Sequence, residues 1–223
     1  MKKIILSAIP LILLLAFFLP GILVKVKIEC RSQYGDCPRE VVDRIGGLNG
    51  KNMSVARREL KKELKSNFLV SAFTVQFKLP NILRVDLIVK KPVYALKKAE
   101  SDVLALVDRE GTVLAVSNQA FTPVVITKGN LLEAGEKVNE KDLSALELMD
   151  GVYKMYQTST GNIEGDTLLV ELPGPIRVIF PLAGTDRNML LGSLRLIYSN
   201  IRDDKGTILY SQIDLRYKNP VLR

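Results

Sequence analysis

Histidine is absent from the 223-residue chain, and cysteine occurs only twice. Histidine is the commonest general base and the commonest metal ligand, so its absence removes the usual starting point for both kinds of site. Two cysteines without histidine also disfavour a zinc site. No segment of the sequence has the residue spacing of a phosphate-binding loop or of a nucleophile elbow. We therefore expect a protein that is not an enzyme and has neither a cofactor nor a metal ion.

Aromatic residues make up only 6% of the chain, and the net charge is +8. Residues 25–92 carry 15 Lys and Arg against 7 Asp and Glu, whereas residues 93–223 carry 15 against 17. Few aromatic side chains interleave the basic ones and no nucleic-acid-binding motif occurs, so we expect no nucleic acid as a partner. Two interpretations of the basic segment stay open: a solvated face, or a surface that attracts anionic lipid headgroups.

Charge is missing altogether from residues 4–24, a run of 21 residues that follows Lys2 and Lys3. An apolar run of about 20 residues is long enough to cross a bilayer as a helix. A cleaved signal peptide has a shorter apolar core, of about 7–15 residues, and a small-x-small cleavage site, which this run lacks. The sequence therefore favours an uncleaved transmembrane signal-anchor at 4–24 over a cleaved signal peptide. Residues 1–3 would form a cytoplasmic tail, and the chain after Val24 would lie outside the cytoplasm.

The two cysteines, Cys30 and Cys37, bracket the turn-rich segment Arg31-Ser32-Gln33-Tyr34-Gly35-Asp36. Disulfides persist outside the cytoplasm, so an exported location favours a structural bridge between them. The alternative is a pair of free thiols. A bridge across so short a loop contributes about 2.5 kcal/mol in the chain-entropy treatment.

Residues 25–92 predict a small two-layer module. A first strand covers the alternating residues around Val26, and helices follow at Arg39–Ile45 and Val55–Ser66, the second capped by Ser54. A hairpin then turns at Leu79-Pro80-Asn81, because apolar and polar residues alternate on both sides of it. Two helices on one face of a three-stranded sheet form a stable arrangement of this order.

Residues 93–223 predict a second, β-rich domain with two helices, and the fold class is therefore α+β. Glu140–Tyr156 and Asn188–Tyr198 have the apolar spacing of amphipathic helices. We expect a hairpin of Val103–Val107 and Thr112–Val116 around Asp108-Arg109-Glu110-Gly111, a pair of strands Thr167–Glu171 and Ile176–Phe180, and a last strand at Ile208–Tyr217.

The order of these elements resembles the FtsQ/DivIB family of bacterial cell-division proteins. The first module, with the order β-α-α-β-β, is similar to a POTRA domain. Lys90-Lys91-Pro92-Val93-Tyr94-Ala95 stands where the family has its seam between domains, and Ile213-Asp214-Leu215-Arg216-Tyr217 is the most specific match. The resemblance implies a transmembrane helix at 4–24, a POTRA domain at 25–92 and an FtsQ-type β domain at 93–223.

The resemblance also implies a function: a membrane scaffold of the divisome, single-pass in the cytoplasmic membrane at the septum. It would bind coiled-coil partners like FtsB/DivIC and FtsL and so control septal peptidoglycan synthesis. A partner strand would add at the C-terminal edge of the sheet, on a surface comprising Tyr217, Lys218, Asn219, Pro220, Val221, Leu222 and Arg223. Tyr217 would anchor the partner, unless it packs inside the domain, and Asp214 and Arg216 would fix the strand. The alternative function is a secreted or membrane-anchored POTRA accessory that handles exported polypeptides.

Overall fold

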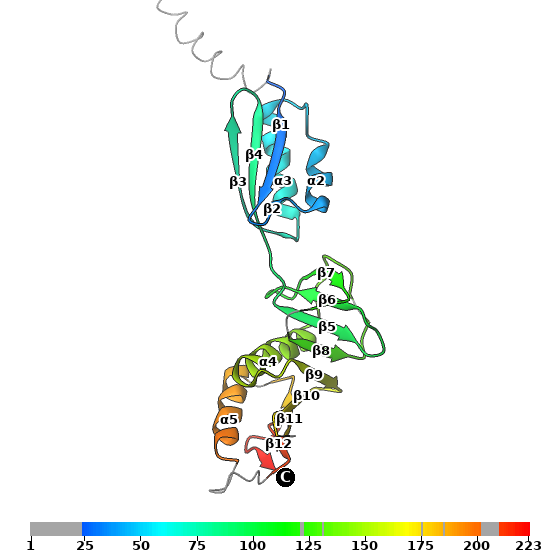
Figure 1. Cartoon of the computed structure of the whole chain (residues 1–223), viewed down its shortest axis with the longest axis vertical. Coiled ribbons are helices and arrows are strands. Elements are labelled where there is room, and N and C mark those ends of the chain that lie inside the picture. The colour runs from blue at the N-terminus through cyan, green and yellow to red at the C-terminus, as the bar shows by residue number, and fades with distance from the viewer. Residues whose placement is uncertain (1–23, 121–122, 131, 175, 185, 202–209) are drawn as a thin grey trace, which may run out of the picture. The chain divides into compact units, whose positions relative to one another are not determined.

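The computed structural model describes residues 24–120, 123–130, 132–174, 176–184, 186–201 and 210–223. The chain divides into two compact units, one ending at Lys90 and the other beginning at Lys91. The division falls two residues before the expected boundary at Pro92. Each unit has its own sheet, so the described chain is a mixed α+β protein with two sheets (Figure 1).

The sheet of the first unit has four strands in the order β2-β1-β4-β3. The long hairpin of β3 (Val70–Lys78) and β4 (Ile82–Val89) is antiparallel, and β1 (Lys27–Ser32) lies parallel to β4 on its other side. The fourth strand, β2 (Gly35–Asp36), is a two-residue return of β1 and was not predicted. The alternation along β4 is confirmed, because Leu83, Val85 and Leu87 are buried.

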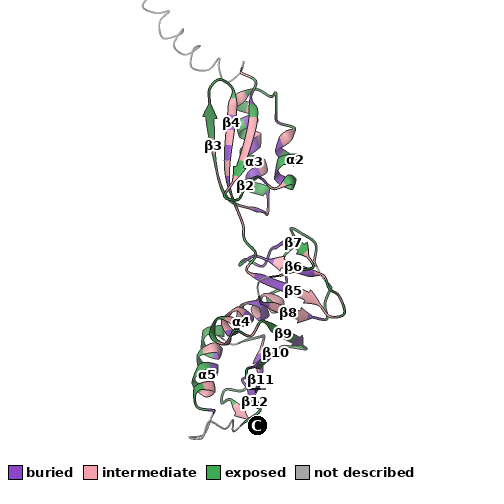
Figure 2. Cartoon of the chain, viewed as in Figure 1, coloured by how far each residue is buried: buried purple, intermediate pink, exposed green. Residues whose placement is uncertain are grey.

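Helices α2 (Arg39–Gly46) and α3 (Met53–Ser66) cover one face of this sheet. Ala56, Leu60 and Leu64 recur every four residues on α3 and are each at most 1% exposed, so they form the stripe that packs on the sheet. The predicted cap at Ser54 is wrong: the helix begins at Met53, two residues before the predicted start at Val55, and Asn52 occupies the N-cap position. Figure 2 colours the first unit by burial, and the charged residues of α3 are each either exposed or half-buried.

Cys30 at β1 and Cys37 just after β2 are joined by a disulfide, with their Cα atoms 5.8 Å apart. The bridge closes the β1–β2 return. Gln33, in the same return, donates from Nε2 to the carbonyl oxygen of Val89 at 2.8 Å and accepts at Oε1 from the Val89 N–H at 2.9 Å. One side-chain amide thus pairs both backbone groups of the last residue of β4, as a neighbouring strand would.

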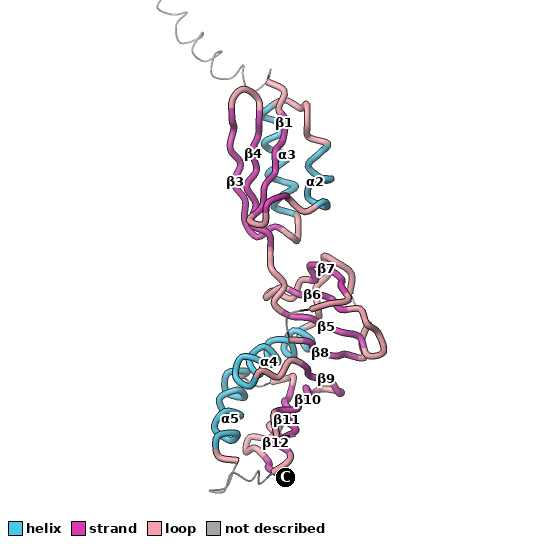
Figure 3. The backbone as a smooth tube through the Cα atoms, in the orientation of Figure 1, coloured by secondary structure: helices cyan, strands magenta, loops and turns pink. Residues whose placement is uncertain are grey.

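The second unit contains one nine-stranded sheet in the order β13-β12-β11-β10-β9-β8-β5-β6-β7. The strands, shown in magenta in Figure 3, are β5 (Tyr94–Lys98), β6 (Leu104–Val107), β7 (Val113–Ser117), β8 (Val124–Thr127), β9 (Thr160–Glu164), β10 (Thr167–Leu172), β11 (Ile176–Pro181), β12 (Gln212–Asp214) and β13 (Val221–Leu222). The pairs β5–β8, β8–β9 and β11–β12 are parallel, and the remaining neighbours are antiparallel. A parallel pair needs a crossover connection, and the two helices described in this unit provide two of them.

Helix α4 (Glu140–Tyr156) connects β8 to β9, and α5 (Arg187–Ser199) lies between β11 and β12 in the chain. Asn139 caps α4 by accepting from the Asp142 N–H at 2.8 Å, and Asp186 caps α5 by accepting from the Asn188 N–H at 2.8 Å. Apolar residues of both helices join the core of the sheet, with Leu146, Met149 and Leu194 at most 1% exposed.

The predicted transmembrane helix and single-pass membrane location require correction. Among the described residues, no helix is long and apolar enough to cross a membrane. The 17 residues of α4 span about 25 Å at 1.5 Å per residue, short of a hydrocarbon core of about 30 Å, and their first turn carries Glu140 and Asp142. The span expected at 4–24 lies outside the described residues, except for Val24. The membrane part of the predicted fold class and the predicted localisation are therefore set aside.

Candidate partner-binding edge

The C-terminal edge of the nine-stranded sheet carries every residue that the sequence predicted for partner binding. Strand β12 is parallel to β11, with Val178 opposite Ile213 and Ile179 opposite Asp214. The chain then bends through residues 216–219 and returns as β13, antiparallel to β12. The predicted strand Ile208–Tyr217 is thus only three residues long where it is described, and residues 208–209 lie outside the described part.

The seven predicted contact residues separate into two groups. Tyr217, Lys218, Asn219 and Pro220 lie in the exposed bend, and Tyr217 is 55% exposed. Val221 and Leu222 form β13 and are half-buried, and Arg223 follows them as an exposed residue. The alternative that Tyr217 packs inside the domain is wrong. An aromatic residue that is half exposed beside a sheet edge is available to a partner.

Asp214 holds the start of the bend in place. Its side chain has no exposed surface, and its carboxylate accepts from the backbone N–H of Arg216 at 3.1 Å and from that guanidinium at 2.9 Å (Nε) and 2.6 Å (Nη2). These hydrogen bonds lower the pKa of Asp214 below its ordinary value, and they outweigh the burial that would raise it. The same guanidinium carbon lies 5.8 Å from the centre of the Tyr217 ring. Asp214 and Arg216 thus orient the residue that follows them.

Two of the other outer edges, those of β7 and β3, differ in their accessibility. At β7, the N–H of Val113 donates to the Glu136 carbonyl oxygen at 2.9 Å and the Gly135 N–H donates to the Val113 carbonyl oxygen at 2.8 Å, so the start of this edge is covered. In the first unit, β3 is nine residues long and is the last strand in its sheet. Phe77, near its end, is 41% exposed. The β3 edge is therefore a second surface on which an extended segment could add.

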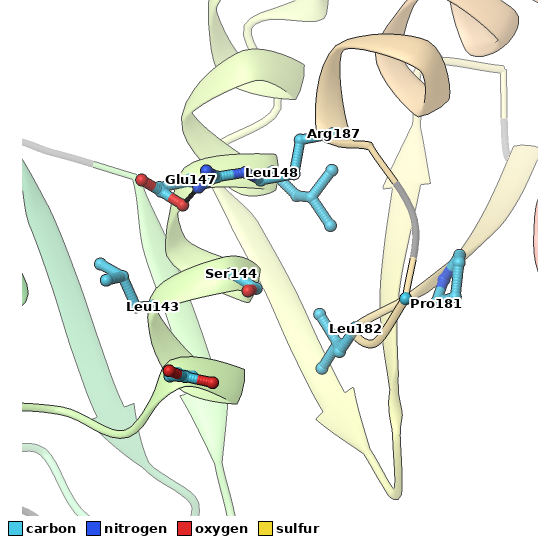
Figure 4. Close-up of a pocket in the computed structure, with 9 residues that line it drawn as sticks. Leu143, Ser144, Glu147, Leu148, Pro181, Leu182 and Arg187 are labelled. Atoms are coloured by element: carbon cyan, nitrogen blue, oxygen red, sulfur yellow. Dashed lines mark ion pairs between the residues drawn. The ribbon is translucent and has the colours of Figure 1, made fainter.

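A pocket of about 280 Å³ lies between α4 and the connection from β11 to α5 (Figure 4). Leu143, Ser144 and Leu148 line it from α4, and Leu182 lines it from the connection. Glu147 and Arg187 form an ion pair across it that ties the start of α5 to α4. Among the described residues, no group of three or more Asp, Glu or Cys side chains could hold a metal ion. The pocket is thus a gap between α4 and the segment that leads into α5.

Part of the positive charge of the first unit lies on α3. Arg57, Lys61 and Lys65 are exposed and recur every four residues, so they share one flank of the helix. Glu59 and Glu63 lie on the opposite flank and are less exposed, and Glu59 accepts a hydrogen bond from Lys51 Nζ at 2.7 Å. Binding of anionic lipid headgroups by this flank stays a prediction, as does its alternative, a solvated face.

Sequence reasoning missed β13 and therefore did not foresee that the edge of β12 is paired. The local signal was present, because Val221-Leu222 is an apolar pair with β propensity directly after Pro220. A two-residue strand is too short to show an alternation. No protein-family model matches the chain, and no curated protein matches it either.

Proposed function

We propose that this chain is a non-enzymatic binding protein of the bacterial division machinery, in which the second unit captures an extended segment of a coiled-coil partner. The observation that carries the proposal is the exposed Tyr217 at the bend beside the outer edge of the nine-stranded sheet. Backbone groups at a sheet edge provide affinity for an added strand, and an exposed aromatic residue provides an anchor.

The partner class comes from the resemblance to the FtsQ/DivIB family. The segment Ile213-Asp214-Leu215-Arg216-Tyr217 supports it, because the structure gives these residues separate tasks. Ile213 and Leu215 are buried in the core, Asp214 and Arg216 form the ion pair, and Tyr217 is exposed. Partners like FtsB/DivIC and FtsL are thus the first proteins to test, and control of septal peptidoglycan synthesis is the role that their capture would serve.

The experiment is capture of an FtsB/DivIC-like and an FtsL-like protein, expressed together with the full chain, by affinity purification. Tyr217→Glu places a charge at the proposed anchor and is expected to reduce the captured amount at least tenfold. Tyr34→Glu is the matched control: Tyr34 is 63% exposed but belongs to the first unit, so capture should be unchanged.

Thermal denaturation of both variants shows whether the exposed substitutions leave the fold intact. Undiminished capture by a folded Tyr217→Glu variant would contradict the proposed surface. The β3 edge of the first unit would then be the next surface to test.

A further inference from the structure

The outer edge of β12 is occupied by a segment of the same chain. Leu222 lies opposite Ile213, and Val221 lies opposite Asp214. The carbonyl oxygen of Arg223 accepts from the N–H groups of Ser211 at 2.7 Å and Gln212 at 2.9 Å, and the Arg223 N–H donates to the Gln212 carbonyl oxygen at 3.0 Å. A partner strand that uses the backbone groups of β12 must therefore replace these hydrogen bonds.

Besides these hydrogen bonds, residues 221–223 are held by the packing of Leu222 against the core of the second unit. The strand has two residues, its side chains are only half-buried, and the bend that precedes it is exposed throughout residues 216–220. Pro220 has no N–H to contribute to a ladder. Short edge strands with exposed connections belong to the least stable parts of a fold, which open without global unfolding. The outer side of β13 is itself a poor template for a partner, because two residues present too few backbone groups.

The side chains of residues 221–223 indicate which side chains a partner strand needs when it pairs with β12. Leu222 packs against the core of the second unit on the side of Ile213. On the other side, Asp214 is fully buried, and the pKa of its carboxyl group is lowered first by hydrogen bonds from Arg216 and also by the charge of Arg223. An aliphatic residue followed by a cation thus satisfies both sides of the edge.

We propose that β13 occupies the position of the partner strand while the protein is unbound, and that the partner strand displaces β13 when it binds. The displacing segment runs antiparallel to β12 and carries an aliphatic residue opposite Ile213, followed by a basic residue in the place of Arg223. This inference rests on the proposed function for the identity of the partner, but the displacement itself can be tested without that partner.

The first experiment uses a fluorescent peptide with the sequence of residues 217–223 and a chain that ends at Arg216. We expect saturable binding to the shortened chain and at least tenfold weaker binding to the full chain, whose edge is already occupied. A peptide with Leu222→Asp should lose binding, and one with Arg223→Glu should bind several-fold more weakly. Equal binding to both chains would overturn the inference, as would no binding to a shortened chain that melts like the full one.

A second variant covers the case in which the shortened chain does not fold. Leu222→Asp in the full chain removes the apolar contact of β13 but keeps its length. Amide hydrogen exchange at Ser211 and Gln212 should become at least tenfold faster, while exchange at Val178 in β11 stays unchanged. Unchanged exchange at Ser211 and Gln212 would show that β13 is not held as proposed.

The partner itself separates the two proposals. If displacement occurs, Leu222→Asp in the full chain should increase capture of the coiled-coil partner. If capture depends on Tyr217 but does not increase with Leu222→Asp, the displacement is wrong and the proposed function stands. If the peptide binds the shortened chain but the partner is not captured, the proposed function fails and the occupied edge stands.

Discussion

Asp214 is fully buried, and its carboxylate is paired with the guanidinium of Arg216, only two residues further along the chain, at 2.6 Å. The two residues do not face each other across a sheet: they enclose the point where β12 ends and the bend begins. The acid of this pair is buried and the base is half-exposed. Substitution of the two residues should therefore lower the stability of the second unit by different amounts. Removal of Arg216 leaves a buried charge, whereas removal of Asp214 leaves an arginine that can reach water.

The first prediction concerns this pair. Arg216→Gln should lower the stability of the second unit, because a buried carboxylate loses its hydrogen-bond donors. Asp214→Asn should cost less, since an amide needs no counter-charge, and the double variant should recover part of the loss of Arg216→Gln. Urea denaturation of the four proteins measures the coupling. Strictly additive losses would contradict the role given to the pair.

The pH dependence of stability is the second prediction. The pKa of Asp214 is lowered in the folded protein, so the unfolded chain binds the proton more tightly. The stabilisation is therefore fully present above the unfolded pKa, about 3.9, and is lost as the pH falls through the folded value. The difference in unfolding free energy between the wild-type chain and Asp214→Asn should shrink on acidification below about pH 4. A difference that is the same at pH 6 and pH 3 would contradict this.

Two glycines of the second unit provide the third prediction, as a matched pair. A Cβ atom at Gly161, in β9, would lie 2.8 Å from Met149 Sδ and 3.0 Å from Leu168 Cδ1, and both of those side chains are fully buried. Gly161→Ala should therefore destabilise by about 1–3 kcal/mol through overpacking. Gly192, in α5, has open space around it, so Gly192→Ala should stabilise by about 0.5–1 kcal/mol. Melting temperatures that move in the same direction for both variants would refute the packing argument.

Several elements could be predicted because one local pattern determines them. The helix Glu140–Tyr156 begins and ends at the predicted residues, since Asn139 caps it and apolar residues recur at helical spacing. The hairpin of β3 and β4 follows from alternation and a turn sequence. By contrast, β9 contains Gly161 and Asn162, which have low β propensity, and it is a strand because β8 and β10 pair with it on either side. The five residues of β9 alone therefore do not indicate a strand, because the pairing depends on the neighbouring strands.

The sequence predicted where the candidate edge lies, but it did not predict that β13 already pairs with this edge. The predicted residues 217–223 lie at an outer edge of the sheet, and Tyr217 is exposed there; their role in partner binding stays a prediction. The pairing of β13 with β12 depends on residues 221–223 reaching back across an exposed bend, which no periodicity in the sequence indicates. Asp214 shows the same limit: the sequence placed it on the strand, but only the fold shows that the carboxylate is buried and that Arg216 neutralises it.

From β8 to β13 the strands occupy the sheet in the order in which they occur in the chain. During synthesis, each of these strands thus finds its neighbour already made, and contacts between near neighbours form quickly. β12 pairs only with β11 on one side and with β13 on the other, so this end of the sheet is completed by the last strands of the described chain. The backbone groups of β12 are therefore open on its outer side only while residues 221–223 are not paired with it.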